Sequence, residues 1–182
     1  MSRDIAETLR QIGRNRRSLI VFAVPRLAGK STVLKAILAE RPPSSPVLTL
    51  AEDGQDIDQL LKKSAGGYLV IPEITQSGAM PGYIWGTDVR RIFKAAKEDV
   101  SLAATLHADG PDDAFAQISQ GCGVPDTDAS KITFAVHLRS IGRWEEPTRR
   151  VVQSVHAVDG VRNGKPRLKE IHRWDEEHDR FI

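Results

Sequence analysis

The sequence is poor in cysteine, in aromatic residues and in long apolar runs. Its single cysteine, Cys122, excludes an internal disulfide, and no Cys/His spacing indicates a structural zinc site. No apolar run approaches the roughly 20 residues that span a bilayer, and the charged N-terminal residues lack the apolar core of a signal peptide. These absences exclude disulfide scaffolds and membrane-spanning helices, and they predict a cytoplasmic protein.

The chain also lacks a strong excess of either charge. Lys and Arg number 26 and Asp and Glu number 24, so the formal net charge is only +2. Nucleic-acid binding is therefore not predicted, because it generally needs a clustered basic surface. The basic N-terminal helix and the doublet Arg149–Arg150 are the features that would favour it.

The 182 residues suit one compact domain of ordinary globular composition. Up to about residue 130, buried-type apolar runs alternate with amphipathic segments, which is typical of strands and helices around a mostly parallel sheet. Beyond it, strands separated by turns predict an antiparallel end to that sheet. We expect strands at 18–24, 47–50, 68–71, 101–106, 133–138, 149–158 and 167–174, and helices at 2–13, 31–40, 56–64 and 88–98. The prediction is one α/β domain, 1–182, with an N-terminal helix and linker (1–17), a core (18–130) and C-terminal strands (131–182).

One segment carries a motif for phosphate binding. Strand 18–24 leads into Val24-Pro-Arg-Leu-Ala-Gly-Lys-Ser-Thr32, and a helix follows at once. This is the place and shape of a phosphate-binding loop, G-x-x-x-x-G-K-[ST], whose backbone N–H groups surround phosphates. In such a loop Lys30 bridges the β and γ oxygens, and the Ser31 hydroxyl helps to hold Mg²⁺. The residues predicted to bind nucleotide are Pro25, Arg26, Leu27, Ala28, Gly29, Lys30, Ser31 and Thr32; a helix cap that imitates the motif is the alternative.

Three positions of this loop depart from the template. Val24 stands where the first glycine belongs, and Arg26 and Leu27 are bulky where small residues are usual. A valine forced into the left-handed backbone region would cost about 1–3 kcal/mol. Arg26 either adds a charge-assisted contact to phosphate or fills the site as a surrogate cation.

Four segments in order resemble boxes of the ATPases of type II and type IV secretion and type IV pilus machines. Residues 19–32 resemble the family's first strand and Walker A loop, and 47–53 its aspartate box, which ends in Glu-Asp. Residues 68–74 are similar to its Walker B strand, where a glutamate precedes isoleucine, and 101–114 to its histidine box. The resemblance implies a RecA-like P-loop NTPase fold, a three-layer α/β sandwich, with ATP and Mg²⁺ as ligands.

The same resemblance implies roles for three further residues. Glu73 would lie near Mg²⁺ beside Ser31, Glu52 would orient or deprotonate the attacking water, and His107 would contact the γ-phosphate region. Each has an ordinary alternative. Glu52 could belong to a plain loop, Glu73 could be a solvated strand end, and His107 could be hydrogen-bonded packing.

The sequence also departs from this family. Only a short helix precedes the first strand, where the family usually has a separate N-terminal domain, and Thr75 stands where an arginine usually follows the Walker B glutamate. Between the second and third boxes only Lys62 and Lys63 occur, and lysine does not reproduce the forked geometry of arginine. The resemblance therefore implies a minimal member, either an ATPase domain or a non-hydrolysing paralogue that acts as a binding or assembly module. Its partners would be further copies of itself or secretion and pilus components, which could bring it to a membrane.

Overall fold

The computed structural model describes residues 3–24, 27–51, 55–77, 80–143 and 145–182. The helices are α1 (Arg3–Arg14), α2 (Lys30–Ala39), α3 (Ile57–Lys63), α4 (Thr87–Ala95), α5 (Pro111–Ala116) and α6 (Asp126–Ala129), with a π-helical turn at Gln117–Gly121. The strands are β1 (Leu19–Phe22), β2 (Val47–Thr49), β3 (Tyr68–Ile74), β4 (Tyr83–Ile84), β5 (Ser101–Leu106), β6 (Phe134–Gly142), β7 (Pro147–Arg162), β8 (Lys165–Asp175) and β9 (Arg180–Phe181). Their order is β2-β3-β5-β1-β6-β7-β8-β9, with β4 beside β3.

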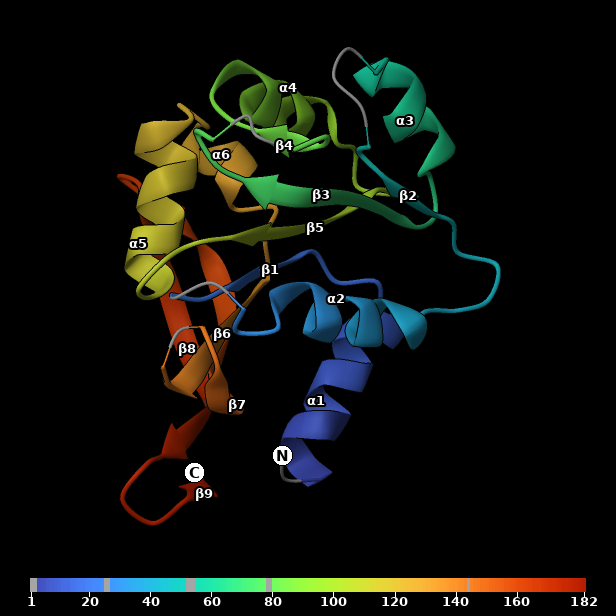
Figure 1. Cartoon of the computed structure of the whole chain (residues 1–182). Coiled ribbons are helices and arrows are strands. Elements are labelled where there is room, and N and C mark those ends of the chain that lie inside the picture. The colour runs from blue at the N-terminus through green and yellow to red at the C-terminus, as the bar shows by residue number, and fades with distance from the viewer. Residues whose placement is uncertain (1–2, 25–26, 52–54, 78–79, 144) are drawn as a thin grey trace.

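Helices cover both faces of the sheet. Successive side chains of a strand point to opposite faces, and in β1 Leu19 and Val21 pack with α1 and α2 whereas Ile20 and Phe22 pack with α3, α4 and α5. Figure 1 shows α1 and α2 on one side of the strands and α3, α4 and α6 on the other. The layers explain why β1, Leu-Ile-Val-Phe, is apolar throughout, since all four residues are buried.

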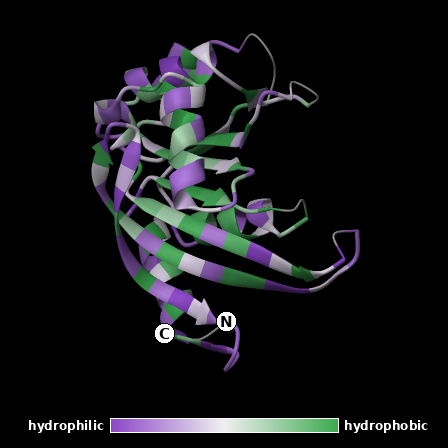
Figure 2. Cartoon of the chain, turned by 90° about the vertical axis from the view of Figure 1, so that its left-hand side faces the viewer, coloured by the Kyte–Doolittle hydropathy of each residue, from purple (hydrophilic) through white to green (hydrophobic). Residues whose placement is uncertain are grey.

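The sheet has a parallel part and an antiparallel part. Strands β2, β3, β5, β1 and β6 pair in parallel, and β6, β7, β8 and β9 pair in antiparallel fashion. Figure 2 shows hydrophobic and hydrophilic residues alternating along the long C-terminal strands. The predicted α/β fold, a mostly parallel sheet ending in antiparallel strands, is confirmed. The two-residue strands β4 and β9 were not predicted, because they are too short to carry a pattern.

This topology brings three chain segments to one edge of the sheet. Strand β5 lies between β1 and β3, with Leu106 opposite Phe22 on one side and Ile74 on the other. The residues that follow β1 and β5, and those at the end of β3, therefore lie together at the carboxyl ends of the strands. Ligands of open α/β sheets bind in this position.

Tyr68 connects the start of β3 to the chain segment between α1 and β1. Its hydroxyl lies 3.3 Å from Ile12 O and 3.2 Å from Arg17 O, the side chain is fully buried, and burial raises the pKa of Tyr68 above its ordinary value. We expect Tyr68→Phe to lower the free energy of unfolding by about 1 kcal/mol, because the variant loses the buried hydrogen bond of the hydroxyl to Arg17 O or Ile12 O. Urea denaturation measures this loss. The half-buried Tyr83 gives a matched Tyr83→Phe control, and an equal loss in both variants would contradict the prediction.

Candidate functional site

The phosphate-binding motif forms the start of α2. Gly29, immediately before the helix, has φ +92° and ψ 19°, a left-handed conformation that glycine adopts without steric cost. The helix then begins at Lys30, and Val33 N donates to Gly29 O over 3.0 Å. Ser31 and Thr32 in the first turn are exposed, so the unsatisfied N–H groups at the positive end of the helix lie open to an anion.

Strain in this loop falls on Leu27 and not on Val24. Leu27 has φ +65°, whereas Val24 is not among the described residues with positive φ, so the cost considered for Val24 does not arise. A leucine held in the left-handed region costs about 1–2 kcal/mol. Its side chain is 58% exposed and gains little from burial in return. Pro25 and Arg26, also predicted to bind nucleotide, lie outside the described residues.

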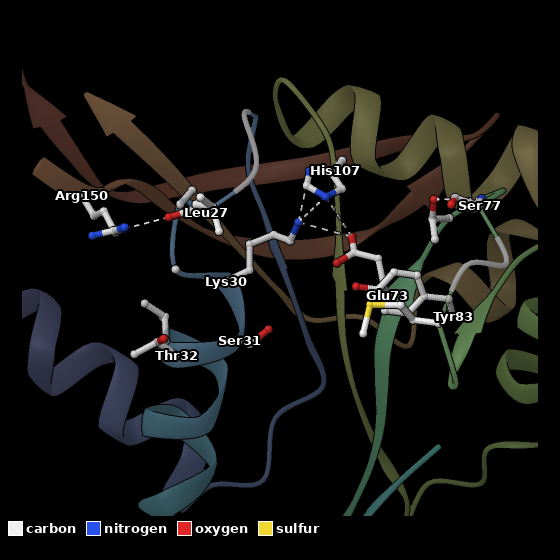
Figure 3. Close-up of a pocket in the computed structure, with 14 residues that line it drawn as sticks. Leu27, Lys30, Ser31, Thr32, Glu73, Ser77, Tyr83, His107 and Arg150 are labelled. Carbon is white, nitrogen blue, oxygen red and sulfur yellow. Dashed lines mark hydrogen bonds and ion pairs between the residues drawn. The ribbon is translucent and has the colours of Figure 1, made fainter. Parts of the chain in front are cut away.

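Three predicted residues from different elements meet beside this loop: Lys30 of α2, Glu73 of β3 and His107 after β5 (Figure 3). Lys30 Nζ lies 3.3 Å from Glu73 Oε1 and 3.1 Å from His107 Nε2. Lys30 and Glu73 are both buried, at 9% and 5% exposure. The cluster is therefore a nearly desolvated ion pair with an imidazole against the cation.

His107 connects the cluster to the end of β1. Its Nδ1 lies 3.3 Å from Ala23 O. Lys30 Nζ lies against both ring nitrogens, 3.2 Å from Nδ1 and 3.1 Å from Nε2. The imidazole is therefore held between the main chain after β1 and the Lys30 ammonium.

One carboxylate oxygen of Glu73 contacts Thr105, and the other faces Lys30. Thr105 Oγ1 lies 2.8 Å from Glu73 Oε2 and 2.5 Å from Pro72 O. Glu73 Oε1 is buried and makes no hydrogen bond within the described part of the chain; Lys30 Nζ is its close neighbour. An oxygen of this kind suits a polar ligand, such as water or a hydrated cation, in the adjoining space.

The residues present fit Mg²⁺. This ion takes oxygen ligands and keeps several waters, using one or two protein groups together with phosphate. Glu73 supplies the spare carboxylate oxygen, and the exposed Ser31 supplies a hydroxyl at the end of α2. Among the described residues no group of three or more His, Cys, Asp or Glu side chains is arranged to hold a metal ion. Ser31 and Glu73 would therefore share the ion with phosphate oxygens and water.

A cavity of about 770 Å³ adjoins the cluster, within the size range of ligand pockets. Its walls include the predicted residues Leu27, Ala28, Gly29, Lys30, Ser31, Thr32, Glu73 and His107. Thr75, Ser77, Met80, Tyr83 and Arg150 also line it and were not predicted as site residues. Trp85, near Tyr83, packs instead against the core and against Gly121. Glu52 lies outside the described residues.

Arg150 has the most direct contact with the loop among the residues that the sequence analysis missed. Its Nε donates to Leu27 O over 2.7 Å. The only signal in the sequence was the basic doublet at the start of a strand, which we considered for nucleic acid. Its proximity to the loop depends on the pairing of β1, β6 and β7.

No family model matches the sequence, and no curated protein matches it. Solved structures do match the fold. The VirB11 ATPase of the Brucella suis type IV secretion system, in complex with sulphate, aligns with a TM-score of 0.60 and 17% identity over 84% of this chain and 51% of that one. The Legionella pneumophila ATPase DotB aligns with a TM-score of 0.57 and 13% identity over 97% of this chain and 50% of that one.

These comparisons define a class of fold. At low sequence identity, the chain shares the α/β fold of the VirB11 ATPase of a type IV secretion system and of the ATPase DotB. It spans about half the length of these two proteins. Within the described residues, no helix is long and apolar enough to cross a membrane.

Proposed function

We propose that this chain binds ATP with Mg²⁺ in the cavity beside α2 and hydrolyses it, as a domain of a secretion or pilus type of motor. The observation that carries the proposal is the meeting of Lys30, Glu73 and His107 at the open N-terminus of α2. Each comes from a different element, and the resemblance to secretion ATPases implies a role at the nucleotide for each of them. The shared fold with VirB11 and DotB supports the same conclusion.

Binding would exchange one set of charge contacts for another. The phosphates would occupy the end of α2, where the backbone N–H groups and the helix dipole favour an anion. The Lys30 ammonium would leave the Glu73 carboxylate and form an ion pair with the phosphate oxygens. Ser31 and Glu73 would hold the bound magnesium ion, which neutralises charge that develops on the phosphoryl group.

Once Lys30 has moved, Glu73 becomes available for the reaction. Its Oε1, which already lacks a hydrogen bond, would accept one from a water and direct that water at the terminal phosphorus. Thr105 would keep the carboxylate in place through Oε2. His107, anchored near Ala23 O, would face the terminal phosphate from the neighbouring strand end. Glu52, which the resemblance implies as a second carboxylate for the water, remains part of the proposal.

A second function, binding without hydrolysis, is favoured by two observations. Leu27 is strained in the loop, and Thr75 lines the cavity where the related family usually has an arginine. In this form the chain would act as an assembly module, with copies of itself or secretion and pilus components as partners. Either function is compatible with a cytoplasmic location, with membranes reached only through partners.

Calorimetric titration with ATP, in Mg²⁺ and in EDTA, together with phosphate-release assays, tests both functions. We expect magnesium-dependent binding and measurable release. Tight binding with no release would replace the first function by the second. Absence of binding in Mg²⁺ would overturn both.

A further inference from the structure

We infer that Arg150 is a positioning residue, which holds the nucleotide-binding loop in its strained conformation from the C-terminal strands. The role of the contact in nucleotide binding rests on the proposed function. The contact itself and its effect on the loop do not. Sequence motifs give no hint of it, because Arg150 and Leu27 are 123 positions apart in the chain.

The geometry of the contact is specific. Arg150 Nε donates to the main-chain oxygen of Leu27 over 2.7 Å, a short and charge-assisted bond. The arginine stem also follows the loop, because a Cβ built on Gly29 would lie 3.6 Å from Arg150 Cδ. One side chain thus hydrogen-bonds to Leu27 and lies beside Gly29, and both of these residues have positive φ.

The loop needs such support at Leu27. Glycine would accept φ +65° freely, whereas leucine is driven from it towards ordinary backbone conformations. A shift of that kind would turn the Leu27 carbonyl away from Arg150. The hydrogen bond therefore opposes relaxation of the strained residue and keeps Gly29 and Lys30 at the start of α2.

Arg150 is placed to hold the loop and not to replace Lys30. Figure 3 shows Arg150 and Lys30 on opposite sides of Leu27, with only Lys30 directed at Glu73 and His107. The neighbouring Arg149 anchors the strand: its Nη2 lies 2.7 Å from Asp179 Oδ1, and its guanidinium lies 5.6 Å from the Trp174 ring centroid. The support for Leu27 thus comes from a strand that is itself fixed.

Hydrogen exchange without nucleotide tests the contact directly. We expect Arg150→Ala to raise the exchange rate of the Val33 amide, which donates to Gly29 O, about fivefold, because an exposed charge-assisted hydrogen bond that holds the loop is lost. Arg167→Ala is the matched control, since Arg167 is an exposed arginine whose Nη2 donates to Asp159 O over 2.9 Å, away from the loop. Equal rates in the two variants would overturn the inference.

Titration with ATP and Mg²⁺ tests whether the contact serves the site. The apparent dissociation constant rises when the competent conformation is only partly populated, so we expect Arg150→Ala to raise it about fivefold, as the lost hydrogen bond implies. Leu27→Gly/Arg150→Ala should bind within about twofold of the native chain, because glycine adopts the conformation without help. A general loss of packing would not be repaired by glycine at 27. If the double variant binds as weakly as Arg150→Ala, the positioning role is contradicted.

The two measurements separate the inference from the proposed function. A native chain that does not bind ATP contradicts the proposed function, while the exchange experiment still decides whether Arg150 holds the loop. A native chain that binds ATP, with Arg150→Ala unchanged in both exchange and affinity, contradicts the inference alone.

Discussion

Replacing Glu73 with glutamine is expected to lower the rate of phosphate release by about 100-fold or more, because the water loses its carboxylate acceptor. Glutamine has nearly the same shape and can still contact Thr105, so the fold and the cavity should persist. Binding of ATP in EDTA should become tighter, since the amide removes a negative charge that lies 3.3 Å from Lys30 and competes with phosphate for it. In Mg²⁺ this gain is offset, because the amide is also a weaker ligand of the ion than the carboxylate. Loss of turnover with retained ATP binding separates a chemical role from a structural one.

Single-turnover assays and calorimetry on the same preparation measure the two effects. Glu98→Gln is a suitable control, because Glu98 is exposed and does not line the cavity. Equal rates of release for Glu73→Gln and the native chain would remove Glu73 from the mechanism. Weaker ATP binding in EDTA, with unchanged phosphate release in Mg²⁺, would contradict both expected effects.

Lys30→Ala is expected to abolish detectable ATP binding and also to destabilise the protein by about 3 kcal/mol, because a buried carboxylate is left without its cation. Lys30 and Glu73 are both nearly excluded from solvent, so water compensates little for the missing ammonium. The two losses have different causes. Binding fails because the Lys30 ammonium is no longer there to contact the phosphates. Stability falls because the buried Glu73 carboxylate is left without the same ammonium.

A double variant separates those causes. Lys30→Ala/Glu73→Gln should recover most of the stability in urea denaturation and none of the ATP binding, because no buried charge remains. Lys35→Ala, one turn along α2 and exposed, should match the native chain in both measurements. If the double variant is as unstable as Lys30→Ala, the loss reflects packing of the lysine stem and not the ion pair.

The site residues that the sequence predicted either lie in one short motif or stand at the ends of successive apolar runs. Strand β1 is apolar because it is buried on both faces, and Gly29-Lys30-Ser31 follows it directly, so the loop was visible in one short segment. Glu73 lies near the end of one apolar strand and His107 directly follows another. The carboxyl ends of parallel strands lie together at one edge of the sheet. Their convergence on Lys30 was therefore predictable from chain order.

The remaining features depend on three-dimensional pairing. Arg150 reaches Leu27 because β6 pairs with β1 in parallel and β7 returns beside it, in a register that no local pattern encodes. Val24 stands at the template's first glycine, but the residue with positive φ is Leu27, because a backbone angle is set by how the loop joins the strand to the helix. The residue type at one position of the motif does not determine that backbone angle.

The central position of β1 has a consequence for folding. Its partners are remote in the chain: Leu19 pairs with Ala103 on one side and with Phe134 on the other. Contacts between distant segments are entropically costly and form slowly. Because the ribosome releases the N-terminus first, the loop between β1 and α2 emerges long before β5 and β6, the strands that flank β1. The site therefore forms late, after most of the chain has been synthesised, and nascent chains that end before β6 should not retain nucleotide.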